Sequence, residues 1–373
     1  MILLLQFIKI KIMKQLFSLM LLAITASTFA TVHTVSNNPA TLAQFNNINT
    51  AVTAAANGDT IYIHGSPTAY LAFTQTNKQL TFIGPGFTPD KNSSFAALVP
   101  GCTITGALCA NSEYQGITFT STISINSAKP DNLRFIRNNF SNLSISIGQG
   151  GVTYSGYLFE GNLFDNSSAE ASTSSTYQNF LFQNNYFYES GCCRDGNIGG
   201  FFNSINVLFD HNLWFGPGGG VRNAFSNSCR FLTITNNIFV RRNGSSNNSN
   251  SVFNNNITFY PAGSVNPGAP WTLNGNTNGG GNQDNLDPQM AAQASVNAGT
   301  NNGVADYTIA AGPANNTGSD GKDMGLLYDV TGSLNFANSR NSRLPRIFSM
   351  NVITPTVAPG ANVTINVDAR ISN

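Results

Sequence analysis

Apolar and polar residues follow one short pattern that returns six times between Asp131 and Tyr260. Each copy has an inward-type apolar residue, two mostly polar residues, an asparagine, a variable residue and then an aromatic residue, which is Thr258 in the last copy. The asparagines are Asn138, Asn162, Asn185, Asn212, Asn237 and Asn256, spaced by 24, 23, 27, 25 and 19 residues. This spacing is far longer than a helical or strand period, so the pattern predicts a solenoid of stacked repeats.

Each copy reads as a strand, a turn and a second strand. Leu133 and Phe135 alternate with Arg134 before the asparagine, and Phe140 resumes the apolar side after it. One such unit cannot bury its apolar face alone, so we expect successive units to stack in parallel, about 4.8 Å apart. The recurrent asparagines should form a ladder of hydrogen-bonded amides and supply the left-handed conformation that a sharp corner needs.

Segments of different pattern flank the repeats. Residues 41–57 are predicted to form a helix with its apolar residues on one face, a capping box of Thr41 and Gln44, and an end at Gly58. Near the other end, 347–353 and 362–369 are strand-like. The outward residues before each inward ring include three leucines that stack in register and should be covered. The candidates to cover this apolar strip are the long loops, the two C-terminal strands and another molecule, and we favour the C-terminal strands. The strip consists of Arg134, Leu158, Leu181, Leu208 and Thr233.

The predicted helix is followed by a strand beginning with Gly-Asp and by a second strand ending in Gly84-Pro85-Gly86. In this order of elements, in the repeat period and in the inward Phe and Ile positions, the chain resembles the pectin-lyase-like superfamily, specifically its secreted bacterial β-helix repeat proteins. The resemblance implies an all-β fold, a right-handed parallel β-helix solenoid with an N-terminal capping helix and a short C-terminal β-strand pair. We expect a signal peptide over 1–30, with 1–12 either part of it or upstream of the true start. The β-helix should then span 31–329, and a C-terminal tail 330–373.

Composition agrees with an exported β protein. The chain has 52 Asn and 35 Gly, and only 9% of its residues are charged. Lysines at 9, 11 and 14 interrupt the first apolar run, which favours a signal peptide over a membrane anchor, and no other long apolar run follows. Without this segment 15 basic and 17 acidic residues remain, unclustered, which argues against nucleic-acid binding. The oligomeric state is left open.

Five cysteines in an exported chain leave at least one unpaired. The five are disulfide candidates: Cys102 and Cys109 lie in one short loop and could form a bridge, and either Cys192 or Cys193 could reach Cys229 in the next coil. The histidines are scattered, so no metal site is predicted from them.

Two polar columns follow the inward residue of each copy and contain the candidate chemistry. Asp210-His211 resembles the Asp-His motif of pectate lyases, but the companion Arg-x-Pro-x-x-Arg motif is absent, and no lysine lies between Lys129 and Lys322. The motif sets of polygalacturonases are missing as well. The weak catalytic candidates are Arg137, Glu160, Asp210 and His211, and the binding candidates are Gln183, Asn184, Tyr188 and Trp214.

The sequence therefore supports two functions. The first is a non-catalytic, exported β-helix at the cell surface or in the extracellular matrix, which binds carbohydrate or acts in adhesion and needs no cofactor. The alternative is a divergent polysaccharide lyase that uses Ca²⁺. A polysaccharide or a cell-surface glycan is the expected partner in both cases, and the fold hosts both activities.

Overall fold

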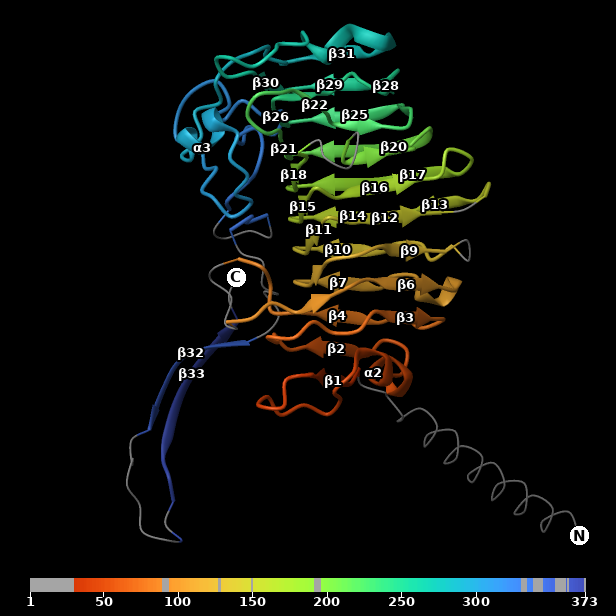
Figure 1. Ribbon diagram of the computed structural model, residues 1–373, viewed down its shortest axis with the longest axis vertical. Coiled ribbons are helices and arrows are strands. Elements are labelled where there is room, and N and C mark those ends of the chain that lie inside the picture. The colour runs from red at the N-terminus through yellow and green to blue at the C-terminus, as the bar shows by residue number, and fades with distance from the viewer. Residues whose placement is uncertain are drawn as a thin grey trace, which may run out of the picture.

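The computed structural model describes residues 30–88, 94–126, 129–148, 150–190, 196–329, 334–337, 345–352, 360 and 362–371. The predicted signal peptide and the cysteines Cys192 and Cys193 lie outside these residues. Within them the chain is a parallel β-helix, as predicted, whose coils stack along the long axis of the molecule (Figure 1). No helix in the described ranges is long and apolar enough to span a membrane.

Three parallel sheets form the faces of the β-helix, and each is named here by a letter. Sheet A contains β1 (Val32–Val35), β2 (Thr60–Ile63), β4 (Thr81–Ile83), β7 (Glu113–Gln115), β10 (Arg134–Ile136), β14 (Leu158–Glu160), β17 (Thr176–Gln183), β20 (Asn203–Asp210), β25 (Leu232–Thr235), β29 (Val252–Asn254) and β31 (Thr277–Gly280), with β13 (Thr153–Ser155) beside β17. Sheet B contains β3 (Phe73–Thr76), β6 (Cys102–Thr105), β9 (Ile123–Ile125), β12 (Ser144–Ile147), β16 (Ser168–Ala171), β19 (Ile198–Gly199) and β23 (Phe225–Ser226). Sheet C contains β5 (Leu98–Val99), β8 (Thr118–Phe119), β11 (Asn139–Ser141), β15 (Leu163–Asp165), β18 (Tyr186–Tyr188), β21 (Leu213–Phe215), β26 (Ile238–Val240) and β30 (Ile257–Phe259).

Short elements complete the coils. The strands β22 (Arg222–Asn223) and β27 (Arg242–Asn243) pair with each other, as do β24 (Cys229–Arg230) and β28 (Asn248–Ser249). The 3-10 helices η1 and η2 span Ala107–Cys109 and Pro270–Gly275. The α-helix α3 spans Gln293–Ala298.

The predicted register is confirmed. Phe135 pairs with Phe159, Phe159 with Phe182, Phe182 with Phe209, and Phe209 with Ile234. These rings are fully buried, and Phe182 and Phe209 stack with centroids 4.5 Å apart. Repetition therefore builds the core, because each coil places the same ring over the same ring of the next.

The N-terminal helix is shorter than predicted. The helix α2 spans Ile48–Ala54, with Asn47 as its N-cap, so the predicted start at Thr41 is wrong. The preceding residues pair with β1 instead: the Phe45 N–H donates to the Thr34 carbonyl (3.0 Å), and the Phe45 carbonyl accepts from the Ser36 N–H (2.9 Å). Backbone pairing with the first strand thus outcompetes the capping box, and Leu42 is 98% exposed.

The C-terminal strands β32 (Pro345–Val352) and β33 (Ile365–Ile371) form an antiparallel hairpin. They pair only with each other within the described part of the chain, and Val363, Ile365 and Val367 are about half exposed. The leucines of the strip, Leu158, Leu181 and Leu208, remain partly exposed on sheet A. The prediction that the hairpin covers this strip is therefore wrong.

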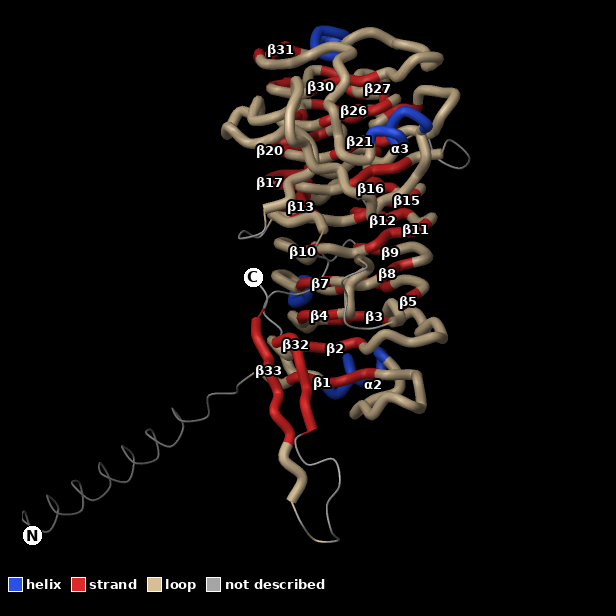
Figure 2. Tube along the Cα trace, turned by 90° about the vertical axis from the view of Figure 1, so that its left-hand side faces the viewer, coloured by secondary structure: helices blue, strands red, loops and turns tan. Residues whose placement is uncertain are grey.

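A different segment covers an outer face of the β-helix. Residues 284–329, called the strap below, include α3 and run back along the outside of sheet C, where α3 is labelled in Figure 1; this side faces the viewer in Figure 2. Strap residues Met290, Val296, Tyr307 and Met324 are buried together with the outward side chains of sheet C. Those sheet C side chains are Leu163, Tyr186, Tyr188, Leu213, Phe215, Ile238, Val240, Ile257 and Phe259. The sequence analysis did not predict this second apolar layer, although runs such as Leu213 to Phe215 and Ile238 to Val240 are continuously apolar, which is typical of strands buried on both faces.

Candidate functional site

The corner between sheet A and sheet C contains the predicted asparagine ladder. Each amide Nδ2 donates to the Oδ1 of the asparagine in the next coil at 2.9 to 3.3 Å, from Asn138 through Asn256 to Asn282. The same Oδ1 also accepts from the backbone N–H of the preceding asparagine, as in Asn162 to Asn185 (2.9 Å). The ladder is confirmed and is one asparagine longer than the sequence pattern indicated.

The left-handed residue of the corner is the one before each ladder asparagine. Arg137, Asn184, His211, Asn236 and Asn255 have φ between 49° and 57°. Gly161 occupies the same position with φ of 64°. The prediction that the ladder asparagines adopt this conformation is wrong. The residue before each of them makes the turn, and the amide of the ladder asparagine points into the corner, where it bonds to the next coil. Asn and Gly are the residues that tolerate positive φ best, which explains most of this column.

This left-handed column holds the strap. Asn255 Nδ2 donates to the Thr317 carbonyl (2.9 Å), and Asn236 Oδ1 accepts from the Ser319 N–H (2.7 Å). His211 Nε2 lies 3.3 Å from Asp320 Oδ2, and its side chain is 1% exposed. Four consecutive coils thus anchor the strap at four points along one edge, the fourth being Asn184, described next.

Asn184 was a binding candidate, and the structure gives it a structural contact. Its Oδ1 accepts from the Leu327 N–H (2.7 Å), and its Nδ2 donates to the Leu327 carbonyl (3.3 Å). The residue is 1% exposed. Both hydrogen-bonding groups of the amide are therefore used by the strap.

Two further binding candidates are buried. Trp214 is fully buried between Phe187 and Phe239, with ring centroids at 4.2 and 5.6 Å, so it belongs to the core. Tyr188 is 8% exposed and packs beneath the strap in the apolar layer outside sheet C. Neither ring is placed to stack on a sugar. Only Gln183 of the four candidates lies at the surface, partly exposed on sheet A.

The column that immediately follows the inward residue stays partly open. Glu160, Gln183, Asp210 and Thr235 pair in register on four successive coils. The leucine strip, Leu158, Leu181 and Leu208, lies in the same strands two residues earlier, on the same side of the sheet. Sheet A therefore presents an apolar row and a polar row side by side, and this pair of rows is called the two-row surface below.

The Asp210 carboxylate is held firmly in the polar row. Gln183 Nε2 donates to Oδ2 at 3.0 Å, while Thr235 Oγ1 and Asn236 Nδ2 donate to Oδ1 at 2.9 and 2.8 Å. Two of these donors point at Oδ1 and one at Oδ2, so the carboxylate keeps about one of its roughly four lone-pair positions, at Oδ2, for a further partner. The described residues also include no group of three or more His, Cys, Asp or Glu placed to hold a metal ion.

The four catalytic candidates lie in two places along the stack, with Arg137 and Glu160 near each other and Asp210 and His211 further along. Burial raises the pKa of Glu160, and the nearby Arg137 and Arg134 guanidinium groups partly oppose this. Arg134 Nε lies 3.2 Å from Glu113 Oε2. Asp210 and His211 are two coils further along, about 10 Å away at the strand spacing. Arg137 is 7% exposed and His211 is 1% exposed, so both of these catalytic candidates are buried.

The described cysteines are free thiols. Cys102, Cys109 and Cys229 are buried and unbridged, so the predicted Cys102–Cys109 bridge and the bridge to Cys229 are wrong. Cys109 Sγ instead donates to the Thr105 carbonyl (3.3 Å), and Cys229 Sγ to the Ser226 carbonyl (3.4 Å). Burial raises the pKa of the Cys102, Cys109 and Cys229 thiols, which keeps them protonated and unreactive.

Comparisons with known proteins add little beyond the fold. No protein-family model matches the sequence, and no curated protein is similar to it. Among solved structures the chain is similar to a rhamnogalacturonan lyase, with 12% identity over 62% of this chain and 69% of that one and a TM-score of 0.26. A likeness of this size carries no argument about what this chain binds or catalyses.

Proposed function

We propose that this protein is an exported, non-catalytic β-helix that binds a polysaccharide along sheet A. The observation that carries the proposal is the two-row surface, in which Leu158, Leu181 and Leu208 lie beside Glu160, Gln183 and Asp210 on three successive coils. Export is inferred from the signal-like sequence of residues 1–30, and the binding from this surface.

The chemistry of the two rows suits a sugar polymer. A sugar ring has apolar C–H faces and a rim of hydroxyl groups that both donate and accept hydrogen bonds. The leucine row supplies flat apolar contact, and the neighbouring row supplies two carboxylates and an amide. Because the coils repeat about every 4.8 Å, a chain of similar units lying along the stack would meet the same pair of rows again.

Rigidity of the polar row strengthens this proposal. Three donors fix the Asp210 carboxylate, and Gln183 is held by one of these contacts. Side chains already ordered in the free protein lose less conformational entropy on binding. The same contacts leave the Asp210 carboxylate little capacity for a calcium ion, which counts against the lyase alternative with its candidate residues Arg137, Glu160, Asp210 and His211.

The test is retention of the purified protein on a panel of immobilised polysaccharides. Leu181→Asn and Gln183→Ala should each weaken retention by about tenfold, whereas Leu108→Asn, a leucine 66% exposed at η1, should have no effect. Equal retention of all four proteins would show that the two-row surface is not used. In parallel, soluble uronate polymers with and without calcium are followed by the absorbance of an unsaturated product. Product formation abolished by Glu160→Gln would favour the lyase.

A further inference from the structure

A cavity lies beside the strap, away from the two-row surface on sheet A. A cavity of about 510 Å³ opens where the strap passes residue 88, within the size range of small-ligand sites. Val304, Ala305, Tyr328, Phe336 and Ala337 line its apolar part. Its polar lining is Thr88, Asp306, Thr308 and Asn335, with Gly303 at the edge.

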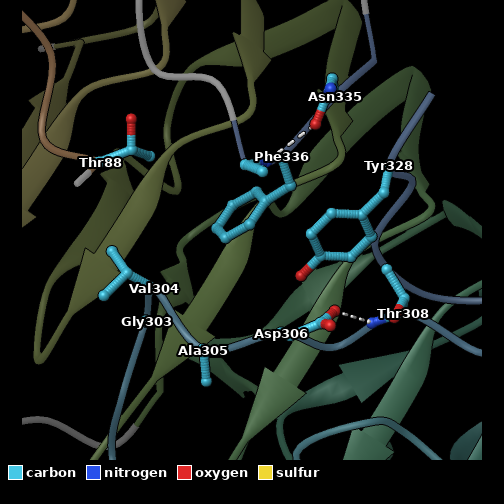
Figure 3. Close-up of a pocket in the computed structure, with 10 residues that line it drawn as sticks. Thr88, Gly303, Val304, Ala305, Asp306, Thr308, Tyr328, Asn335 and Phe336 are labelled. Atoms are coloured by element: carbon cyan, nitrogen blue, oxygen red, sulfur yellow. Dashed lines mark hydrogen bonds between the residues drawn. The ribbon is translucent and has the colours of Figure 1, made fainter. Parts of the chain in front are cut away.

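The walls of the cavity are fixed by backbone pairing. Tyr328 and Asn335 form an antiparallel bridge, and the Phe336 N–H donates to the Leu327 carbonyl at 3.0 Å. Phe336 is 3% exposed and meets Tyr328 edge to face, with ring centroids 6.3 Å apart. In Figure 3 the hydroxyl of Tyr328 and the ring of Phe336 point toward the space that Val304 borders.

Hydrogen-bonding groups of both kinds surround this space. The Tyr307 N–H donates to the Tyr328 oxygen (3.1 Å), so the hydroxyl proton of Tyr328 must point elsewhere. Burial raises the pKa of Tyr328, which keeps the phenol neutral and a donor. Asn335 Oδ1 accepts from the Ala337 N–H (3.1 Å), which leaves the amide Nδ2 as a donor. Asp306 is held at the rim by the Thr308 N–H, which donates to Oδ1 at 3.0 Å, and supplies acceptors.

We infer that this cavity binds one neutral sugar ring, either free or at the end of a chain. An apolar wall with a phenol donor, an amide donor and a carboxylate acceptor matches a ring with C–H faces and hydroxyl edges. Among the described residues that line the cavity, Asp306 is the only charged one, so a uronate would bring a second negative charge beside it. The cavity therefore selects neutral sugars over uronates. This inference concerns a second site and does not depend on the two-row surface.

The test is titration calorimetry of the full chain with glucose, galactose, mannose and rhamnose, and with glucuronate and galacturonate. At least one neutral sugar should bind, and glucuronate and galacturonate should each bind at least about tenfold more weakly than that sugar. Val304→Arg fills the cavity from a residue that is 44% exposed, so it should fold and lose the neutral sugar. Val265→Arg, at a valine 71% exposed elsewhere, is the matched control and should bind as the original protein does.

Asp306→Asn tests the basis of selectivity. The amide oxygen can still accept from the Thr308 N–H, so the rim should keep its shape while the charge is removed. The preference for neutral sugar should then shrink. Absence of binding by every neutral sugar, unchanged binding by Val304→Arg, or an unaltered preference in Asp306→Asn would each overturn the inference. If the sheet A variants lose retention on polysaccharides but still bind the neutral sugar, the two-row surface is affected and the cavity is not.

Discussion

The coils and the strap contain similar residues but are held in different ways. In the coils each strand pairs with the next coil, and each ladder asparagine is bonded on both sides along the stack. The strap has one short helix and is joined to the β-helix at separate points, through Asn255, Asn236, His211 and Asn184. Repetition makes the coils cooperative. The strap packs on sheet C only once, so we expect it to open without unfolding the coils. The coils therefore provide the stability of the β-helix, whereas the strap determines the surface outside sheet C.

Removing a stacked ring should have the largest effect on the coils. Phe209→Ala should lower the free energy of unfolding by about 3 to 5 kcal/mol, because the ring packs against Phe182, Trp214 and Phe225 and leaves a cavity. Denaturant unfolding measures this change. The exposed Phe95 serves as the control, since Phe95→Ala should change stability by less than about 0.5 kcal/mol. Equal stability of the two variants would mean that the register is not the one described.

Breaking the ladder should cost less than removing a ring. Asn185→Ala should destabilise the protein by about 1 to 3 kcal/mol, because the Phe159 carbonyl and the amides of its neighbours lose buried partners. The same unfolding experiment applies, with Asn46→Ala at an exposed position as the control. If Asn185→Ala lowered the free energy of unfolding by no more than the control does, the ladder would not contribute to stability.

Releasing one anchor of the strap should leave the coils unchanged. Asn184→Gly keeps a residue that tolerates the φ of 56° but removes both contacts with Leu327. Amide exchange of residues 317–327 should become faster while that of the coil strands stays the same. Asn179→Gly is matched in conformation, with φ of 57°, but contacts Asn206 and not the strap. Faster exchange throughout the coils of the Asn184 variant would contradict the proposed independence of the two parts.

The smallest effect is expected at the first strand and depends on pH. Burial alone would raise the pKa of Asp59, but hydrogen bonds from the Thr31 N–H, His33 and the Ala56 N–H outweigh it and lower the pKa. A carboxyl whose pKa is lowered by folding stabilises the fold above its unfolded pKa of about 3.9 and loses that contribution as pH falls through the folded pKa. The protection of β1 amides from hydrogen exchange, relative to the intrinsic rate at each pH, should therefore fall in acid.

Asp59→Asn separates this carboxyl from the other acids of the chain. In the variant, the protection of β1 amides near neutral pH should already be lower, and its further decrease in acid should be smaller than in the original protein. The pairs β25 and β29 provide an internal reference, since they lie far along the stack. An identical pH profile in both proteins would show that Asp59 does not control the first strand.

The ladder and the inward rings could be predicted from the sequence because each coil needs the same kind of residue at the same position. A residue that must fill the core or close the corner in one coil has a counterpart in the next, and the counterparts pair as expected from Phe135 to Ile234. The polar row of Glu160, Gln183 and Asp210 was predictable for the same reason. The N-terminal helix was less predictable, because the pairing of Phe45 with β1 competes with its helical pattern.

The sequence by itself determined the period, the inward rings and the ladder, since these depend on neighbours one coil apart. Tertiary structure alone decided where the strap lies, and with it the burial of Tyr188, the contacts of Asn184 and His211, and the cavity beside Tyr328. The contact between Asn184 and Leu327 joins residues 143 positions apart, outside the repeat. No periodic signal marks such a contact, because it forms once and depends on how the whole segment packs on sheet C.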